Sequence, residues 1–510
     1  MSEKNDNEKG SLFFWFVESR LDKSVHKDIP VVVWLNGGPG CTSTVGMFYE
    51  NGPIKFDQAN KSPEQKYNFM RNPNSWNNEA HVLYVEQPVR TGFSLVGAKK
   101  RHIKNEFQLR SDFHDFLENF FEVFSEYRHN KLFIAGESYG GMYVPNIALE
   151  IVERNVLRNL EGVAIGNGIV DPIQDSTQAD FAYSHGLIPS KIRDVIKYRF
   201  DTLCDKTKAP GLDPNCDMET MVMDASGNPN EFNTATFISY DSTIFDPSEV
   251  YHVFLNDPSV QEMIHVRGRN LPGHNLKQYE KEPNADGFYE PIPWSPCNDQ
   301  IGTDMNEDRP KSALSALKYL TDSGVRVLLY SGSNDLTCNI LGTLKFLENN
   351  KWRGKNWSSA TRGLLKVPNS EEVAGEFNTI DDGQFGFFIV RNSGHLVPFD
   401  QPVVALELIT RFLKNKNIID IPLPSEQSYI DSVQGMQDSN GSSSLPYFFF
   451  SFSIVLLAII FGYKHLSSSS KTEDTNIESN KKEFFEMEKM SATSTSTKPN
   501  TSSTSSYQKI

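Results

Sequence analysis

A glycine-flanked serine follows directly on a short apolar run in the first third of the chain. Residues 132–135 (LFIA) have the composition of a buried strand, residues 136–140 (GESYG) match the pattern G-x-S-x-G, and a helix-compatible segment begins near Gly141. A nucleophile elbow needs this strand–turn–helix context, because the tight turn presents the serine hydroxyl at the end of a sheet. The pattern alone recurs by chance, so the prediction of a nucleophile at Ser138 also depends on its partners.

Apolar runs of strand length alternate along the chain with segments of helical periodicity. Predicted strands cover residues 12–17, 31–35, 81–86, 132–135, 162–168, 325–330 and 385–390, and predicted helices cover 107–124 and 402–413. This alternation favours an α/β protein with a mostly parallel central sheet. The phenylalanines of 107–124 recur at helical spacing, which we interpret as core packing, so we expect no cofactor there.

Two further chemistry-bearing residues each follow a predicted strand. Asp335 lies just after 325–330, and His395 lies just after 385–390. Either residue alone fits a turn aspartate or a loop histidine, but the order Ser138, Asp335, His395 is that of the α/β-hydrolase triad. Serine is a weak nucleophile, so a histidine must take its proton and an aspartate must fix the imidazole tautomer. The fold class predicted is therefore an α/β-hydrolase.

A glycine-rich loop, residues 36–41 (NGGPGC), follows the strand predicted at 31–35. Its glycines allow an irregular turn whose backbone N–H groups can point at a ligand. An ordinary tight loop is the alternative. In a hydrolase with a G-x-S-x-G elbow, however, a loop at this place supplies part of the oxyanion hole.

Composition excludes several classes of partner and site. The net charge is −15, which disfavours nucleic acid because its phosphates would be repelled. Five cysteines in 510 residues do not make a disulfide scaffold, and no CxxC or histidine-rich spacing predicts a metal site.

The alternation of predicted strands and helices is interrupted at several places, and these interruptions divide the chain into segments. From about residue 181 to 309, Pro, Asn and Asp are frequent and strands cannot be assigned, which predicts an inserted cap over the site. The predicted organisation is a core in two parts (11–180 and 310–415), the cap (181–309), a polar linker (416–446), a transmembrane helix (447–463) and a disordered cytosolic tail (464–510).

The segment 447–463 (YFFFSFSIVLLAIIFGY) has seventeen uncharged residues, the lower end of what spans a bilayer. A buried core helix is the alternative, but the polar flanks favour lipid. Lys464 follows at once and acidic residues precede, so we expect a single-pass type I protein with its catalytic part in the lumen. So short a span suits Golgi membranes better than the plasma membrane.

Four motifs together resemble the serine carboxypeptidases: WLNGGPGC (34–41), GESYGGMYVP (136–145), SGSND (331–335) and SGHLVPFDQP (393–402). The resemblance covers roughly residues 12–413. With the predicted membrane segment, it is greatest to the fungal Kex-type, pheromone-processing members. It implies acyl-enzyme removal of C-terminal Lys or Arg from peptides and proteins, on the trans-Golgi network membrane. Alternatives are a broad-specificity carboxypeptidase, an acyltransferase on the same scaffold, or an inactive protective scaffold.

The resemblance also implies roles for individual residues. The backbone N–H groups of Gly38 and Tyr139 correspond to the oxyanion hole. Four side chains correspond to the group that binds the terminal carboxylate of the substrate: Trp34, Asn36, Glu50 and Glu137. We expect a protonated Glu137, since burial and like charge raise a carboxyl pKa, and hence better kcat/KM at acidic than at neutral pH.

Cysteines and glycosylation acceptors receive roles by the same resemblance. It implies the disulfides Cys41–Cys297 and Cys204–Cys216, and a free thiol near the substrate pocket at Cys338. In the secretory route, three N-x-S triplets would be candidate glycosylation sites: Asn60, Asn356 and Asn440.

The sequence also departs from the family pattern. Glu86 and Arg90 replace an aspartate and a glycine that are usual in the Kex-type loop, so we expect that wall of the site to differ. The polar residues 1–10 lack the apolar core of a signal peptide. Since the family normally carries a signal peptide and further strands before residues 12–17, we interpret the start at Met1 as a truncated gene model or an alternative start, which a search of the upstream genomic sequence for an in-frame signal peptide would test.

Overall fold

The computed structural model describes residues 10–22, 27–56, 66–95, 102–157, 159–203, 217–227, 233–234, 247–266, 293–308 and 311–438. Residues 1–430 form one compact unit and residues 431–510 a second. In the described ranges, only helix α13 (Glu426–Asp438) reaches into the second unit. The fold below is that of the first unit.

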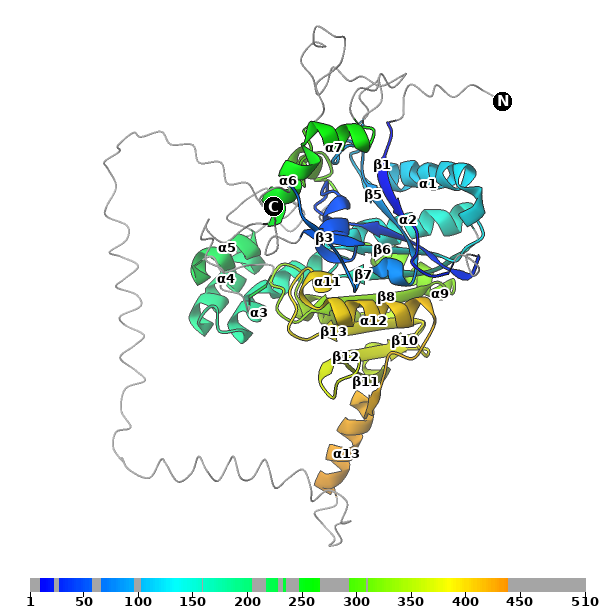
Figure 1. The fold of residues 1–510 in the computed structure, drawn as a ribbon. Coiled ribbons are helices and arrows are strands. Elements are labelled where there is room, and N and C mark those ends of the chain that lie inside the picture. Colours follow the sequence, from blue (N-terminus) through cyan, green and yellow to red (C-terminus); the bar gives the residue numbers. More distant parts are fainter. Residues whose placement is uncertain are drawn as a thin grey trace, which may run out of the picture. The chain divides into compact units, whose positions relative to one another are not determined.

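A ten-stranded sheet forms the centre of this unit (Figure 1). Its strands, in spatial order, are β1 (Phe13–Val17), β5 (His81–Glu86), β2 (Val31–Leu35), β6 (Leu132–Glu137), β7 (Leu160–Gly166), β8 (Arg326–Gly332), β13 (Phe385–Val390), β12 (Val373–Ile380), β11 (Thr361–Lys366) and β14 (Ile421–Leu423). From β5 to β13 the strands are parallel, and the strands at both edges are antiparallel. The prediction of an α/β fold with a mostly parallel sheet is confirmed.

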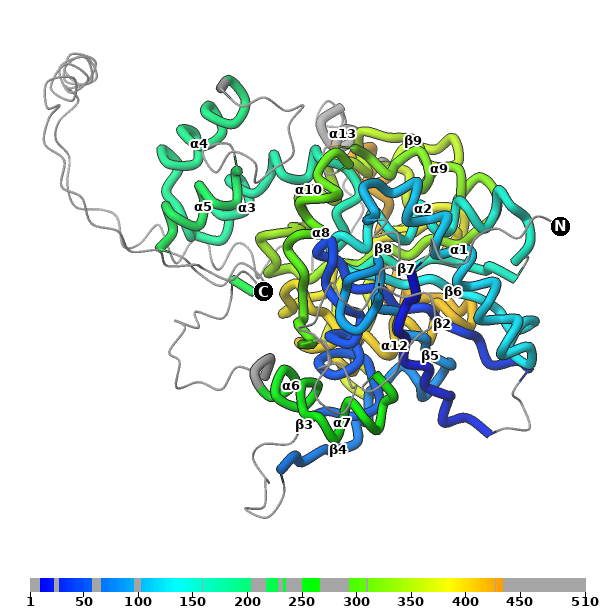
Figure 2. The backbone as a smooth tube through the Cα atoms, turned by 90° about the horizontal axis from the view of Figure 1, so that it is seen from above, coloured from blue at the N-terminus to red at the C-terminus, as the bar shows by residue number. Residues whose placement is uncertain are grey.

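Helices cover both faces of the sheet, which explains why its central strands are apolar throughout. Side chains of β2 alternate between two hydrophobic clusters: Val31, Val33 and Leu35 in one, Val32 and Trp34 in the other. On the first face lie α1 (Glu106–Val123), α2 (Gly140–Arg154), α9 (Leu314–Asp322) and α10 (Ile340–Glu348); on the second lies α12 (Pro402–Leu413) (Figure 2).

The helix predicted at 107–124 is α1, and its aromatic residues do pack in the core. Phe113, Phe120 and Phe121 are buried, whereas Phe107 at the helix start is 67% exposed. Phe14 and Phe16 of β1 meet Phe120 edge to face. These aromatic contacts therefore hold α1 against β1, the first strand of the sheet.

Between β7 and α9 the described elements are helices, in two separate groups in both views (Figures 1 and 2). One group is α3 (Gln178–Ser184), α4 (Ser190–Leu203) and α5 (Met218–Ser226), with a small core of its own that includes Phe181 and Val222. The other is α6 (Pro247–Leu255) and α7 (Pro258–Met263), and α8 (Asp299–Asp304) follows later in the chain. This is the region predicted to be a cap.

Shorter elements complete the unit. Two small sheets pair β3 (Ile54–Phe56) with β4 (Phe69–Arg71) and β9 (Lys351–Trp352) with β10 (Lys355–Asn356). Short helical segments lie at Gly46–Glu50, Trp76–Asn78, Ser125–Tyr127, Pro172–Thr177, Trp357–Ser359 and Val397–Asp400 (α11).

The predicted linker is not structureless at its start. Residues 421–423 form the edge strand β14, which tolerates Pro422 because an edge strand leaves one row of N–H groups unused. None of the helices in the described ranges combines the length and apolarity needed to cross a bilayer. The predicted membrane segment 447–463 and the tail 464–510 lie outside these ranges.

Candidate active site

Ser138 occupies the sharp turn between β6 and α2. Its φ of +60° lies in the left-handed region, which is costly for a residue with a side chain and is typical of functional turns. The turn is fixed by its own backbone: the N–H of Ser138 donates to Gly166 at 3.1 Å, and its carbonyl accepts from Gly141 and Ile169, both at 2.9 Å. A Cβ on Gly141 would lie only 2.4 Å from the carbonyl oxygen of Ile169, which explains the glycine there.

Asp335 and His395 lie in the loops that follow the neighbouring parallel strands β8 and β13. The two loops are joined, because the N–H of Asn334 donates to the carbonyl of Ser393 at 2.8 Å. The His395 Nδ1 lies 2.8 Å from the Asp335 Oδ2, and both side chains are almost fully buried. The structure thus brings together the predicted acid and base.

The electrostatics of this pair suit a general base. Burial by itself lowers the pKa of His395, but the charge of Asp335 and its hydrogen bond outweigh burial, so the pKa is raised above the ordinary value. A base with a raised pKa takes a proton from serine more readily once it is neutral.

Asn167 is a site residue that sequence reasoning missed. Its Nδ2 donates to the Asp335 Oδ2 at 2.6 Å, and its Oδ1 accepts the N–H of Gly332 at 3.2 Å. Asn167 is fully buried and has a φ of +43° in the turn after β7. The only signal in the sequence was a polar residue between two glycines (166–168) at the end of a strand.

The two triad loops are also held by residues 233–234 of the predicted cap. The N–H and the hydroxyl of Thr234 both donate to the carbonyl of Asn334 at 2.9 Å. Asn233 donates to the Asp400 Oδ2 at 3.0 Å, and the same carboxylate accepts the N–H of Gly394 at 2.6 Å. A short segment of the region between β7 and α9 therefore contacts the Asp335 loop directly and is linked to the His395 loop through Asp400.

Four residues predicted to bind a carboxylate form one buried cluster. The Asn36 Nδ2 lies 3.3 Å from the Oε1 of Glu50 and 3.3 Å from the Oε1 of Glu137. The Trp34 Nε1 donates to the Asn36 Oδ1 at 2.8 Å and so orients the amide. Glu137 directly precedes Ser138, which places this cluster beside the nucleophile.

Ionisation of both glutamates of the cluster is unfavourable in free energy. Burial, and then the charge of Glu50, raise the pKa of Glu137 well above its ordinary value. Burial also raises the pKa of Glu50, against the hydrogen bonds of Glu137 and Asn36. Like charges in contact oppose ionisation of both groups, so this arrangement favours a pair that shares a proton.

The glycine-rich loop after β2 lies against the elbow. A Cβ on Gly37 would lie 2.3 Å from the backbone nitrogen of Tyr139, so only glycine allows this approach. Gly38 has a φ of +104°, again suited to glycine. The loop ends at Cys41, whose N–H donates to the carbonyl of Gly37 at 3.1 Å and whose side chain forms a disulfide with Cys297.

Cys338 lies beside the acid and the base. Its thiol is buried, and ligand-type atoms of Cys338, Asp335 and His395 all lie within 4.8 Å of one another. Its backbone N–H donates to the Asp335 Oδ1 at 3.2 Å. Burial, and then the charge of Asp335, raise the pKa of the thiol well above its ordinary value, so it stays protonated.

Glu86 and Arg90, the two residues that depart from the family pattern, have different neighbours in the structure. Glu86 is fully buried and accepts hydrogen bonds from the hydroxyls of Thr42 and Thr44, both at 2.6 Å, just after the glycine-rich loop. Arg90 has a φ of +78° and donates to the Asp304 Oδ2 at 2.9 Å, so its side chain is engaged with α8.

The remaining predicted residues are the glycosylation acceptors and the second disulfide pair. Asn356 is exposed on β10, as a glycosylation acceptor must be. Four residues lie outside the described ranges: Cys204, Cys216, Asn60 and Asn440.

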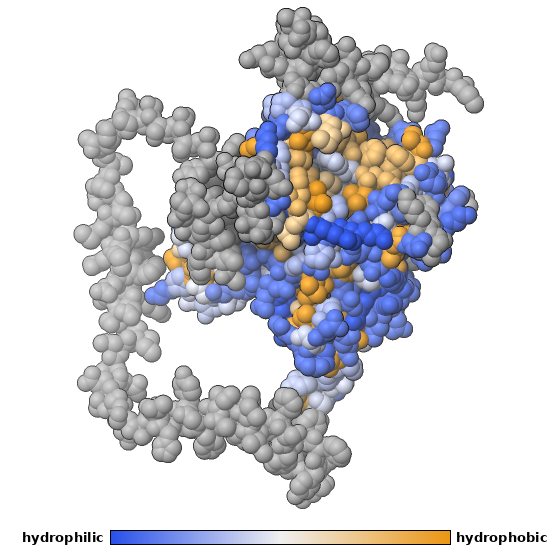
Figure 3. Space-filling model, viewed as in Figure 1, coloured by the Kyte–Doolittle hydropathy of each residue, from blue (hydrophilic) through white to orange (hydrophobic). Residues whose placement is uncertain are grey.

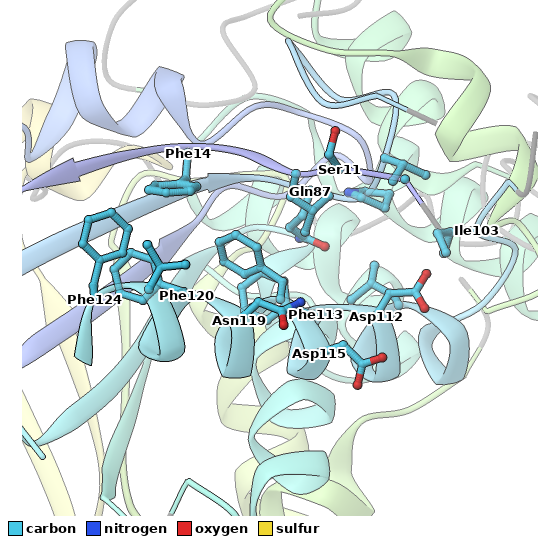
Figure 4. Close-up of a pocket in the computed structure, with 17 residues that line it drawn as sticks. Ser11, Phe14, Gln87, Ile103, Asp112, Phe113, Asp115, Asn119, Phe120 and Phe124 are labelled. Atoms are coloured by element: carbon cyan, nitrogen blue, oxygen red, sulfur yellow. The ribbon is translucent and has the colours of Figure 1, made fainter. Parts of the chain in front are cut away.

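A cavity of about 510 Å³ lies elsewhere, between β1 and α1 (Figure 4). Its lining is mostly apolar and includes Phe14, Phe113 and Phe120. Apolar side chains gather on this side of the unit (Figure 3). No triad residue lines the cavity, so it is separate from the site described above.

Comparisons with known proteins show which family this chain resembles. The family model described as serine carboxypeptidase matches residues 2–415. A serine carboxypeptidase S10 family member of Dictyostelium discoideum is 31% identical over 82% of this chain and 73% of its own length. A pheromone-processing carboxypeptidase kex1 of Neosartorya fischeri is 28% identical over 85% of this chain and 67% of its own length.

Among solved structures, the fold is similar to that of a prohormone-processing carboxypeptidase from Saccharomyces cerevisiae. The TM-score is 0.67 at 24% identity, over 81% of this chain and 88% of the other. This likeness concerns the fold. The family match over most of the chain, together with the Dictyostelium relative, shows that this chain belongs to the serine carboxypeptidase family.

Proposed function

We propose that Ser138, His395 and Asp335 hydrolyse the last peptide bond of peptide and protein substrates. The observation that carries this proposal is the buried contact of 2.8 Å between His395 and Asp335, in loops that follow adjacent strands of the sheet. The Ser138 hydroxyl attacks the carbonyl carbon while the His395 Nε2 takes its proton. Asp335 holds the imidazole through Nδ1 and stabilises the cation.

The remaining steps follow from the same residues. The N–H groups of Gly38 and Tyr139 stabilise the oxyanion of the tetrahedral intermediate. His395 then gives its proton to the departing amino acid, which leaves an acyl-enzyme on Ser138. A water molecule, activated by His395, attacks the ester and releases the shortened peptide.

The carboxylate-binding cluster explains exopeptidase action. Trp34, Asn36, Glu50 and Glu137 accept the free carboxylate of the substrate's last residue, with a protonated Glu137 or Glu50 as hydrogen-bond donor. An ionised pair would instead repel the substrate, because three negative charges would meet in one buried site.

The preferred last residue is Lys or Arg in our proposal. The pheromone-processing relative and the net charge of −15 support this preference. A broad-specificity carboxypeptidase is the second candidate, because Leu396 beside His395 is apolar and the Dictyostelium relative's name states no such preference.

Product analysis separates these candidates. Peptides that differ only in a last Arg, Lys, Leu or Phe would be incubated with the protein, and kcat/KM measured for each. A clear preference for Arg and Lys is expected, whereas equal values would favour broad specificity. Transfer to an added alcohol or amine in place of hydrolysis would indicate an acyltransferase, and failure of an organophosphate to label Ser138 would contradict the enzyme proposal.

We also propose that residues 447–463 span the membrane of the trans-Golgi network, with the catalytic part in the lumen and residues 464–510 in the cytosol. The apolar run and Lys464 support this orientation. Protease added to intact vesicles is expected to remove only an epitope placed after residue 464.

Proton loss from the glutamate pair is expected to weaken binding of free carboxylates. As the pH rises through the raised pKa of Glu137, the ratio of kcat/KM for a peptide to kcat/KM for its C-terminal amide should fall. The ratio cancels the titration of His395, which affects both substrates. Steady-state rates from about pH 5 to about pH 8 measure it.

The matched variant for this test is Glu137→Gln, which keeps a hydrogen-bond donor but cannot ionise. We expect its ratio to vary much less with pH than that of the wild type. A wild-type ratio that is flat or rises over the same range would contradict the proposed role of the pair.

A bulky mercurial is expected to inactivate the enzyme through Cys338. The thiol lies beside Asp335 and His395, so a large adduct would block the pocket although sulfur takes no part in the chemistry. Cys338→Ala should keep most of its activity and resist the reagent. Full activity after stoichiometric labelling of Cys338, checked by mass spectrometry, would contradict this placement.

A further inference from the structure

A fully buried carboxyl group at the end of β5 has no role in the steps above. Glu86 is the last residue of this strand. Strand β5 is the parallel neighbour of β2, and the glycine-rich loop follows β2. Because the carboxyl ends of parallel strands lie at the same edge of a sheet, Glu86 lies beside the loop that carries Gly38.

Four hydrogen-bond donors from three segments of the chain converge on this carboxyl group. The hydroxyls of Thr42 and Thr44 both donate to its Oε1 at 2.6 Å. The N–H of Phe93 donates to Oε2 at 2.5 Å, and the Trp294 Nε1 donates to Oε1 at 3.4 Å. The pKa of Glu86 is raised by burial, and these four hydrogen bonds oppose the rise because each stabilises the ionised carboxylate.

The loop after Glu86 closes tightly over the carboxylate. Gly92 has a φ of +51°, and a Cβ at this position would lie 2.4 Å from the Glu86 Oε2. Glycine is therefore required here both by the backbone conformation and by the space. The carboxylate is enclosed by groups that donate to it.

These contacts hold the end of the glycine-rich loop. Thr42 directly follows Cys41, the last residue of that loop. The next residue, Ser43, donates from its hydroxyl to the carbonyl of Val85 at 2.6 Å and accepts the N–H of Asn36 at 3.3 Å. The end of the loop is therefore tied both to β5 and to its own start.

The segment held by Glu86, residues 42–44, connects the two halves of the proposed site. Before it lies Gly38, which carries an oxyanion donor. After it, the N–H of Gly46 donates to the Asn36 Oδ1 at 3.0 Å, in the short helix that ends at Glu50. A displacement of residues 42–44 must reach both halves, since a close-packed interior transmits strain.

We propose that the Glu86 carboxylate is a positioning residue that fixes the oxyanion donor of Gly38 through the hydroxyls of Thr42 and Thr44. This inference rests on the proposed role of Gly38, and Glu86 itself does not touch the substrate. Oxyanion donors must be placed to within a fraction of an ångström, because their benefit depends on preorganised geometry. An ionised carboxylate suits this task because it accepts hydrogen bonds at both oxygens and offers no donor of its own.

The test compares the wild type with Glu86→Gln and Glu86→Asp. Organophosphate labelling of Ser138, run to completion, counts the active sites. Glu86→Gln keeps the shape of the side chain, but its NH₂ group must face a donor, so the loop has to move. For an N-acyl amino-acid ester, we expect kcat per labelled site to fall about 100-fold in Glu86→Gln, with KM within about threefold of the wild type.

The ester isolates the oxyanion hole, because it lacks the free carboxylate that the Glu50–Glu137 pair would bind. Glu86→Asp keeps the negative charge and should exceed Glu86→Gln in kcat per labelled site by at least about tenfold. Equal rates in the two variants would contradict a role for the carboxylate.

A peptidyl trifluoromethyl ketone probes the oxyanion directly. The Ser138 Oγ adds to the ketone carbon, the carbonyl oxygen becomes an anion, and His395 takes the serine proton. The Ki of this inhibitor should rise in Glu86→Gln by the same factor as kcat/KM falls, because the adduct resembles the tetrahedral intermediate. An unchanged Ki with an unchanged kcat per labelled site would overturn the proposal, even if fewer sites were labelled.

A milder variant keeps the test decisive if Glu86→Gln does not fold. Thr44→Val removes one of the four donors and adds no polar group, so we expect kcat per labelled site to fall about threefold to tenfold and Ki to rise in parallel. Thr91→Val is the matched control. Thr91 is fully buried in the loop after Glu86, and its hydroxyl has no hydrogen-bond partner among the described residues.

Wild-type values of kcat and Ki are expected in Thr91→Val. The same values in Thr44→Val would contradict the proposal. Failure of the proposed function itself would look different, because the wild type would then neither turn over the ester nor take an organophosphate label on Ser138.

Discussion

Ser138→Ala is expected to lower kcat by about 10⁶-fold, with little change in substrate binding. The Oγ of Ser138 is the only protein atom that forms a covalent bond to the substrate in the proposed mechanism. Without it, His395 and Asp335 have no proton to move, and only binding and the oxyanion donors accelerate attack by water. Single-turnover rates and the Kd of a non-hydrolysed peptide would separate chemistry from binding.

His395→Ala should cause a loss of similar size, because the two residues act as one unit. The double variant should therefore be no slower than either single variant. Exposed residues of the same type provide matched controls: Ser323→Ala and His129→Ala should keep full activity. Retention of more than about one hundredth of the wild-type kcat in Ser138→Ala would contradict its role as nucleophile.

Asp335→Asn is expected to lower kcat by about 10⁴-fold without unfolding the protein. Three groups in the described ranges donate hydrogen bonds to its carboxylate or can do so: His395 and Asn167 at Oδ2, and the backbone of Cys338 at Oδ1. An asparagine has one NH₂ group, which must face a donor in either orientation. If it faces His395, the imidazole turns to the other tautomer and its Nε2 carries a proton, so it cannot accept one from Ser138.

The size of this effect distinguishes an orienting carboxylate from a merely structural one. Asp381 offers a control, because it forms surface ion pairs with Arg353 and Lys355, and Asp381→Asn should leave kcat unchanged. Direct NMR observation of the imidazole nitrogens would check the tautomer. Wild-type kcat in Asp335→Asn, with the variant folded, would contradict the proposed triad.

The site residues that lie just after strands could be predicted, because the signal for each lies in the neighbouring sequence. Ser138, Asp335 and His395 each follow an apolar run that the sequence marks as a strand. In a parallel sheet the carboxyl ends of such strands lie at one edge, so side chains just beyond them converge. The glycine-rich loop at 36–41 follows the same rule.

The antiparallel edge of the sheet was not predicted. Strand β11 is only partly buried, and β12 carries polar residues such as Asn378 and Thr379 at buried positions, so their apolar pattern is weaker than that of the central strands. Strand β14 is three residues long and includes Pro422, which argues against a strand on sequence grounds. Pairing with β11 outweighs this local preference.

The helical character of the region between β7 and α9 also escaped prediction. Helices α3 and α5 have only seven and nine residues, too few for a clear period. Their stability comes from a shared small core around Phe181 and Val222. These helices are therefore stabilised by contact with one another, which a local sequence pattern does not reveal.

The amino-acid sequence by itself determined the class of chemistry, since a nucleophile elbow and strand-end loops are local patterns set by backbone geometry. The tertiary structure alone decided which groups support that chemistry. Asn167 meets Asp335 across 168 positions, and Asn36 meets Glu137 across 101 positions. No local pattern marks such pairs, because burial and hydrogen bonding between distant segments depend on how the whole sheet and its helices pack.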